Sequence, residues 1–154
     1  MEYFGAIDQG TTSTRFIVFD NSGKIVEQHQ EEFNQYFPDE YSIEHDPQEI
    51  WISVVNCIEA VLKKIDIKYI SSIGISNQRE TTVAWSKSTG NPLYNAIVWQ
   101  DTRTQSICDD ISNNNNIKED IERTGLPIAT YFSLSKILWL IDNVPEVQSS
   151  LEKD

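Results

Sequence analysis

The sequence has 154 residues, of which 24 are Asp or Glu and 12 are Lys or Arg, so its formal net charge is −12. A chain of this length can bury one sizeable core. Its acidic balance argues against nucleic acids and anionic membranes as partners, because both carry negative charge. Any phosphate-binding site must gather positive charge locally, from a few basic side chains, backbone N–H groups or a metal ion.

The N-terminus lacks a leader-like pattern, and no apolar run approaches membrane-spanning length, so we expect a cytoplasmic protein. The two cysteines, Cys57 and Cys108, have no metal-like spacing and are expected to be reduced thiols. Cys57 falls within a helical pattern, which indicates a core position.

The first third of the chain predicts three strands followed by a helix. Apolar runs at residues 3–8, 14–20 and 24–33 are joined by short turns, which predicts an antiparallel meander. Asp46 is expected to cap a helix that begins at Pro47. The helical spacing of seven apolar residues predicts one buried face, formed by Trp51, Val54, Val55, Ile58, Val61, Leu62 and Ile65.

The rest of the chain alternates short strands with helices. This order predicts the α/β class with a mixed sheet, in one domain covering residues 1–154. Because the sequence ends after a predicted helix, we expect a last sheet strand beyond residue 154. The expected elements are strands at 69–76, 81–85 and 96–99, a turn at 88–92, helices at 102–111, 117–123, 133–143 and 146–152, and a loop at 113–116.

A polar turn after the first strand is a candidate phosphate loop. Asp8 stands at the end of the apolar strand, and Gly10 permits a sharp turn with close backbone approach. Hydroxyl and backbone N–H donors follow at Thr11, Thr12 and Ser13, and Arg15 adds a permanent forked charge. Asp8 is the candidate ligand for Mg²⁺. On composition alone, a hydroxyl-rich hairpin is the simpler interpretation.

A second candidate site follows the strand at 69–76. Arg79 and Glu80 are adjacent, and a guanidinium that donates beside a carboxylate that accepts can clamp two neighbouring hydroxyl groups. Taken alone, the pair is more simply an exposed ion pair worth ~0–1 kcal/mol. Trp99 can offer a flat wall to a polyol or simply pack in the core. Tyr131, on its own, is an ordinary half-buried aromatic residue.

Four segments in order resemble the FGGY carbohydrate kinases, and most closely the branch that phosphorylates glycerol. They are Ala-Ile-Asp-Gln-Gly-Thr-Thr-Ser-Thr-Arg at 6–15, Asn-Gln-Arg-Glu-Thr-Thr at 77–82, Asn-Ala-Ile-Val-Trp-Gln-Asp-Thr-Arg at 95–103 and Tyr-Phe-Ser at 131–133. The resemblance extends from Tyr3 to about Val144. It implies a ribonuclease H-like fold of the actin-like ATPase superfamily, with ATP-dependent transfer of a phosphoryl group to glycerol, yielding glycerol 3-phosphate.

The resemblance also implies roles for individual residues. ATP phosphates would lie on the loop that holds Thr11, Thr12, Ser13 and Arg15, with Mg²⁺ near Asp8. The implied glycerol ligands are Arg79, Glu80 and Tyr131, with Trp99 at the pocket, and Asp101 and Arg103 are given a supporting role.

Members of this family are several times longer than 154 residues and have two domains that close on a cleft. The resemblance therefore implies that the general-base Asp and the adenosine pocket lie outside this sequence, which would leave no catalytic base in the chain. We expect an incomplete N-terminal domain, a separate chain with negligible kinase activity, and either a homo-oligomer or a separately encoded C-terminal half as open options.

Three alternatives remain open. The first is an FGGY kinase for a pentulose or another polyol, against which residues 77–82 and Tyr131 argue. The second is a non-catalytic binding or interaction module that kept the fold. An actin-like chaperone ATPase is the third, and it leaves residues 77–82 unexplained. The kinase hypothesis requires that the turn after the first strand and the Arg79–Glu80 corner face one shared crevice.

Overall fold

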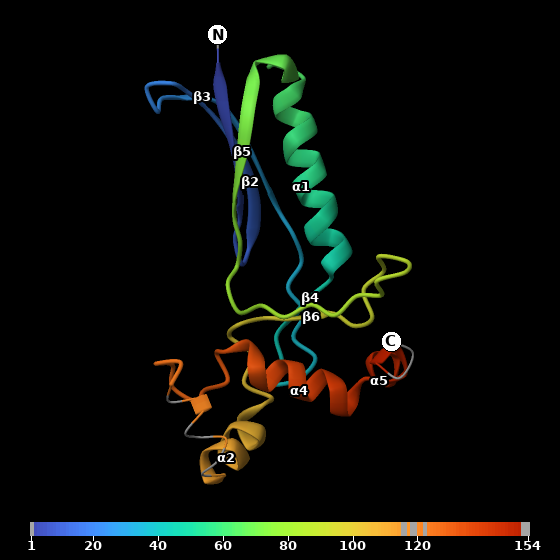
Figure 1. Ribbon diagram of the computed structural model, residues 1–154. Coiled ribbons are helices and arrows are strands. Elements are labelled where there is room, and N and C mark those ends of the chain that lie inside the picture. The colour runs from blue at the N-terminus through green and yellow to red at the C-terminus, as the bar shows by residue number, and fades with distance from the viewer. Residues whose placement is uncertain (1, 115–116, 118–119, 122, 152–154) are drawn as a thin grey trace. The chain divides into compact units, whose positions relative to one another are not determined.

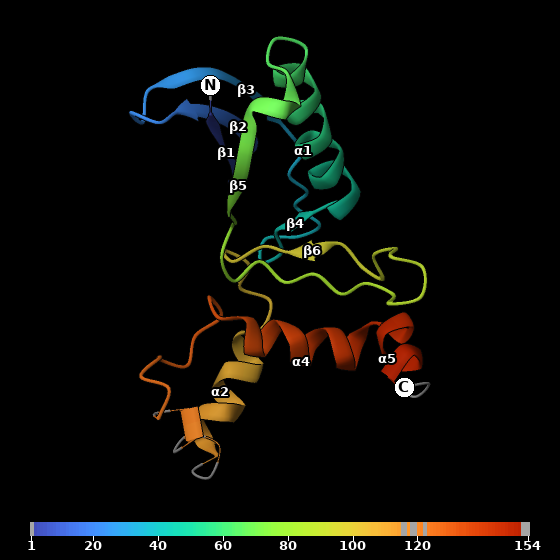
Figure 2. The same ribbon diagram turned by 45° about the horizontal axis from the view of Figure 1, so that its top comes forward.

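The chain forms two units, which are seen in the computed structural model of Figures 1 and 2. Unit 1 comprises Met1–Gln35 and Asp46–Gln78, and unit 2 comprises Tyr36–His45 and Arg79–Asp154. The structure describes residues 2–114, 117, 120–121 and 123–151. Among these, no helix combines the length and the hydrophobicity needed to cross a membrane.

Unit 1 is built on a four-stranded mixed sheet. Strands β1 (Tyr3–Gln9), β2 (Ser13–Asp20) and β3 (Ile25–Glu32) pair antiparallel in chain order, which confirms the predicted meander. Strand β5 (Ile70–Ser76) pairs parallel with β1, so the order is β3-β2-β1-β5. The carboxyl ends of β1 and β5 therefore lie at the same edge of the sheet.

Helix α1 (Pro47–Leu62) runs alongside this sheet (Figure 1). It begins as predicted, since the Asp46 carboxylate accepts a hydrogen bond of 2.8 Å from the backbone N of Gln48. Cys57 is fully buried, as predicted. The residues that fill the core between helix and sheet are Phe16, Val18, Cys57, Val61 and Ile65.

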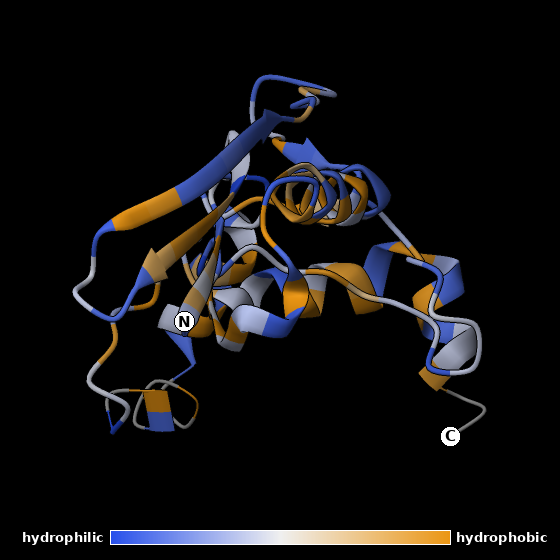
Figure 3. Ribbon diagram, turned by 90° about the horizontal axis from the view of Figure 1, so that it is seen from above, coloured by the Kyte–Doolittle hydropathy of each residue, from blue (hydrophilic) through white to orange (hydrophobic). Residues whose placement is uncertain are grey.

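The predicted buried face of α1 is only partly right, because Trp51 is 63% exposed. The side that meets the sheet carries Ser53, Cys57 and Val61, which are spaced by four residues. Ser53 is accepted in the core because its Oγ shares a hydrogen bond of 2.7 Å with Oγ1 of Thr14. Seen nearly end-on in Figure 3, α1 carries hydrophobic and hydrophilic residues around its circumference.

Unit 2 joins a short β-ladder to helices. Strands β4 (Glu44–His45) and β6 (Ala96–Ile97) pair antiparallel. Three predicted helices are confirmed, with bounds that differ by a few residues at most (Figure 2). They are α2 (Gln105–Asn113), α4 (Ser133–Asn143) and α5 (Pro145–Leu151).

One prediction for unit 2 needs correction. Residues 81–85 do not form a strand and make only isolated bridges, from Thr82 to Ile97 and from Trp85 to Pro92. Pro92 lacks the N–H that a continuous ladder would need. On α4 the buried side chains are Ser135, Lys136 and Leu140, whereas Leu134 and Ile137 are both 45% exposed.

Some predicted segments reach beyond the described residues. The loop at 113–116 includes residues 115–116, the helix at 117–123 includes 118–119 and 122, and the last helix includes residue 152, all of which lie outside them.

Gly5 is required by close packing in the sheet. A Cβ at this position would lie 2.9 Å from the ring of Phe16 and 3.1 Å from Cγ1 of Ile73. Gly5→Ala is therefore expected to lower the free energy of unfolding by about 1–3 kcal/mol. Gly74→Ala is the matched control on the neighbouring strand, where a Cβ would meet nothing within 4 Å. Urea unfolding of both variants measures the difference, and equal stabilities would contradict the packing argument.

Candidate functional site

The predicted phosphate loop of unit 1 is a tight connection between β1 and β2. The backbone N of Gly10 donates to the carbonyl O of Ser13 over 3.0 Å. A Cβ on Gly10 would lie 3.1 Å from that same oxygen, so a side chain there would require the Ser13 carbonyl to shift slightly. The loop thus brings Thr11, Thr12 and Ser13 together at the carboxyl end of β1, as the sequence predicts.

Asp8 and Arg15 lie directly opposite each other in the β1–β2 register. Directly paired residues share a face of the sheet, and this is the face away from α1, since Thr14 and Phe16 point toward the helix. The Arg15 guanidinium donates to Oε1 of Gln30 from Nη2 at 2.7 Å and from Nε at 3.0 Å. Within the described residues no carboxylate forms an ion pair with Arg15, so its charge is available to an anion.

Gln9 was not singled out by the sequence, yet it ties the loop to the neighbouring strand. Its Nε2 donates to the carbonyl O of Gly10 at 3.0 Å, and its Oε1 accepts from Nε2 of Gln78 at 3.1 Å. Gln9 ends β1 and Gln78 lies two residues after the end of β5, the parallel neighbour of β1, and these positions are the signal that could have identified them. The segment leading to Arg79 is therefore fixed beside the loop as far as Gln78.

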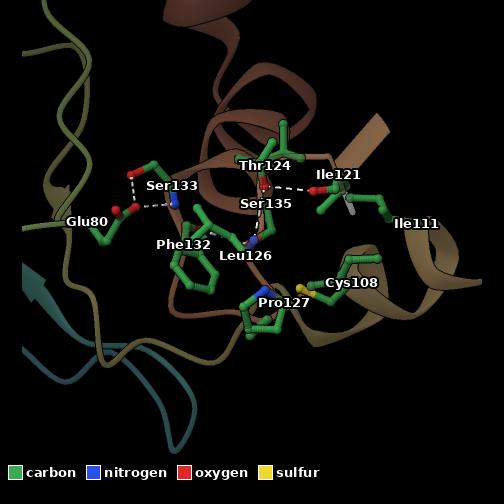
Figure 4. Close-up of a pocket in the computed structure, with 13 residues that line it drawn as sticks. Glu80, Cys108, Ile111, Ile121, Thr124, Leu126, Pro127, Phe132, Ser133 and Ser135 are labelled. Atoms are coloured by element: carbon green, nitrogen blue, oxygen red, sulfur yellow. Dashed lines mark hydrogen bonds between the residues drawn. The ribbon is translucent and has the colours of Figure 1, made fainter. Parts of the chain in front are cut away.

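Glu80 has an unusual backbone. Its φ of +65° makes it the single non-glycine residue with positive φ among the residues that the structure describes. A left-handed conformation disfavours a residue with a Cβ by roughly 1–2 kcal/mol, and such residues concentrate at functional sites. The carboxylate oxygen Oε2 accepts two hydrogen bonds from Ser133, one from its N at 2.8 Å and one from its Oγ at 2.7 Å (Figure 4).

These bonds make Glu80 the cap of α4. The residue at the N-cap position, Phe132, offers no side-chain hydrogen bond, so a distant carboxylate satisfies the first N–H group of the helix instead. The hydrogen bond from the Ser133 hydroxyl is the main cause that holds the pKa of Glu80 below its ordinary value of 4.5. Glu80 is thus ionised at neutral pH, and its Oε1 makes no hydrogen bond within the described part of the chain.

Arg79 precedes Glu80 and is exposed. No hydrogen bond or ion pair joins its side chain to any described residue. An unengaged guanidinium and a half-engaged carboxylate therefore stand next to each other, which is the donor–acceptor pair that a diol requires.

Trp99 and Tyr131 come from distant parts of the sequence and meet in unit 2. Their ring centroids are 5.6 Å apart in an edge-to-face arrangement, and Phe132 adds a second such contact to Tyr131 at 5.1 Å. Tyr131 is 37% exposed. Because Tyr131 lies two residues before Ser133, the bonds from Ser133 to Glu80 bring three of the four predicted substrate residues into one region.

Asp101 and Arg103 form a buried charge network behind this region. The Arg103 guanidinium donates to Oδ2 of Asp101 at 2.8 Å and to Oε1 of Glu44 at 2.7 Å. Burial alone would lower the pKa of Arg103, but these carboxylates raise it. Glu44 also accepts from the Tyr94 hydroxyl at 2.8 Å and from Asn95 at 3.0 Å. Supporting roles for Asp101 and Arg103 fit this network, whereas no role in it was predicted for Glu44.

A cavity of about 230 Å³ opens beside Glu80 in unit 2. Its walls are mainly apolar and include Ile111, Leu126 and Phe132, with the thiol of Cys108 among them (Figure 4). Among the described residues that line this cavity, Glu80 alone carries a charge. An apolar wall next to a carboxylate suits a ligand with one hydrophilic edge.

The chain is similar to known sugar and polyol kinases. Residues 3–153 match the N-terminal domain of the FGGY family of carbohydrate kinases. A glycerol kinase from Roseiflexus sp. (strain RS-1) is 47% identical over 154 residues, which cover 99% of this chain and 31% of that protein.

Two solved structures are also similar. The crystal structure of Plasmodium falciparum glycerol kinase with ADP has a TM-score of 0.89 and 41% identity, covering 99% of this chain and 31% of that one. The structure of ligand-bound xylulose kinase from Lactobacillus acidophilus has a TM-score of 0.86 and 30% identity, covering 97% of this chain and 30% of that one. These neighbours confirm the predicted α/β, ribonuclease H-like class with its mixed sheet. The chain spans about 31% of the length of the curated relative.

The pKa of Glu80 offers a test of the capping geometry. Ser133→Ala removes one of the two donors, so the pKa of Glu80 is expected to rise toward 4.5, and the free energy of unfolding to fall by about 1 kcal/mol. Because the folded pKa lies below the ordinary one, the stabilisation is present above about pH 4.5 and is lost as the pH falls through the folded pKa.

Carboxyl NMR titration of Glu80 measures this shift directly. Ser106→Ala, at an exposed position of α2, serves as the control. If the Glu80 titration were the same in both variants, the Ser133 hydroxyl would not be its partner in solution.

Proposed function

This chain belongs to the FGGY family of carbohydrate kinases, and from that premise we propose that it supplies the acceptor-binding and phosphate-binding residues of an ATP-dependent glycerol kinase. The reaction would transfer a phosphoryl group from ATP to a glycerol hydroxyl and yield sn-glycerol 3-phosphate. The observation that carries the proposal is the left-handed Glu80, which caps α4 with one carboxylate oxygen and leaves the other free beside Arg79.

Each of the proposed acceptor-binding residues would make a different kind of contact with glycerol. The free oxygen of Glu80 accepts from one hydroxyl of the triol, and Arg79 donates to another. The Tyr131 hydroxyl provides a further partner, while the edge-to-face pair of Trp99 and Tyr131 gives the carbon backbone an apolar wall. Because Glu80 is held ionised by Ser133, its oxygens are acceptors at neutral pH. These groups bind and orient the nucleophile, which is a large part of phosphoryl-transfer catalysis.

The loop of unit 1 fits a nucleotide phosphate. Gly10 permits the tight turn between β1 and β2, and the residues that follow it, Thr11, Thr12 and Ser13, carry hydroxyls that can donate to phosphate oxygens. Arg15 adds a charge that no described carboxylate neutralises. Asp8 is exposed at the end of β1, and one carboxylate suffices for Mg²⁺, which keeps phosphate oxygens and waters as its other ligands. When bound, Mg²⁺ would neutralise charge on the phosphates.

Two features favour glycerol over a pentulose. The Arg79–Glu80 corner with Tyr131 resembles the glycerol-contacting residues of the family, and the chain is 47% identical to a glycerol kinase but 30% identical to the xylulose kinase. The general-base Asp and the adenosine pocket would come from segments beyond this sequence. A cytoplasmic location is also part of the proposal.

The acceptor assignment can be tested in a chimera in which this chain replaces the matching segment of the Roseiflexus sp. glycerol kinase. We expect ATP-dependent phosphorylation of glycerol, and none by the 154-residue chain on its own. Arg79→Met and Glu80→Gln should each lower kcat/KM for glycerol by roughly 10- to 100-fold, the usual loss when a hydrogen bond to a charged group is removed.

Lys87→Met, at an exposed lysine of unit 2, is the matched control and should leave kcat/KM unchanged. A chimera that phosphorylates a pentulose in preference to glycerol would replace the proposal with the related sugar kinase. A folded chimera without any phosphotransferase activity, together with a chain that binds no glycerol, would favour the non-catalytic module.

The phosphate loop gives a separate kinetic signature. In the same chimera, Arg15→Met should raise KM for ATP by about tenfold, because one forked contact to phosphate is lost, while KM for glycerol stays within about twofold. Lys24→Met provides the control at an exposed turn of unit 1. An unchanged KM for ATP would remove Arg15 from the phosphate site.

A further inference from the structure

Lys136 is a fully buried charged side chain near the acceptor residues, with 0% of its surface exposed. It lies in the first turn of α4, and its ammonium turns back toward the segment that precedes the helix. The Nζ donates to the carbonyl oxygens of Thr130, of Tyr131 at 2.8 Å and of Phe132 at 3.3 Å. One ammonium thus uses its three protons on three consecutive peptide groups.

This position is unfavourable for a lysine. Burial removes the ammonium from water, and it lowers the pKa of Lys136 although Asp101 and Glu80 act against the shift. The start of a helix also repels positive charge because its exposed N–H groups carry partial positive charge. A methionine has nearly the same length and would avoid both penalties. The lysine therefore needs a reason other than filling space.

The three carbonyl groups belong to the segment that carries Tyr131 and leads into Ser133. Converging on one point, they fix the bend of residues 130–132 immediately before α4. The bend determines where the Tyr131 ring meets Trp99, at 5.6 Å, and where the Ser133 N–H meets Glu80, at 2.8 Å. Without the ammonium, the three carbonyl groups would lose their common hydrogen-bond donor. The bend at residues 130–132 would then lose its main constraint.

We propose that Lys136 is a positioning residue for the acceptor site: by holding the bend at residues 130–132, its ammonium places Tyr131 and, through Ser133, the Glu80 carboxylate. This inference rests on the proposed function for the identity of the ligand, glycerol, but the placement itself can be measured without a ligand.

The test uses Lys136→Met in the 154-residue chain, with two readouts by NMR. Hydrogen exchange of the Ser133 amide should become at least about tenfold faster, since the bend that presents it to Glu80 is released. The dissociation constant for glycerol should rise by about tenfold or more, which corresponds to the loss of one well-placed polar contact. The amides of unit 1 report whether the rest of the chain is unchanged.

Leu140→Ala is the matched control, because Leu140 is buried on the same helix. No hydrogen bond among the described residues joins Leu140 to the bend or to Glu80. It should destabilise α4 but leave the glycerol dissociation constant within about twofold. If Lys136→Met does not fold, Lys136→Gln replaces it, since the amide keeps part of the donor set. Failure of both to fold while Leu140→Ala folds would assign Lys136 to stability and overturn the proposal.

The two readouts separate this inference from the proposed function. Faster Ser133 exchange with no glycerol binding by any variant would support the positioning role and reject glycerol as the ligand. Glycerol binding that is equal in the unsubstituted chain and in Lys136→Met would support the ligand and overturn the positioning role.

Discussion

The acceptor region of unit 2 depends on the hydrogen bonds between the Glu80 carboxylate and Ser133. They satisfy the start of α4, keep Glu80 ionised and leave one of its oxygens for a ligand. The geometry requires that the backbone of Glu80 take a left-handed conformation, which is disfavoured by itself. The hydrogen bonds from Ser133 offset this local penalty, and in the proposed function the same carboxylate also binds the acceptor.

The buried charged side chains of unit 2 are also surrounded by several polar partners. Arg103 lies between two carboxylates, and Lys136 lies among carbonyl groups with Asp101 and Glu80 nearby. Buried ions of this kind add little net stability compared with apolar residues of equal size, yet the loss of one partner is costly. They fix geometry rather than supply free energy, and this suits the proposed binding of a small hydrophilic molecule in one orientation.

Local signals predicted the elements well. The Asp46–Pro47 start gave the first residue of α1, and the turn residues gave the meander of β1 to β3. Periodicity misplaced Trp51 because it cannot foresee that Ser53 would pair with Thr14 in the core. The site residues came from motifs, but Glu44 and Lys136 were missed, since their partners lie 59 residues away in one case and in backbone carbonyls in the other. A pattern read over a few neighbouring residues cannot predict such partners.

The left-handed backbone at residue 80 also limits what can replace Glu80. Gly or Asn would adopt this conformation more easily than Glu. Gly has no side chain and Asn is one methylene shorter, so neither supplies the carboxylate that accepts from Ser133 at the start of α4. Backbone preference and helix capping therefore favour different residues at this position, and the cap prevails.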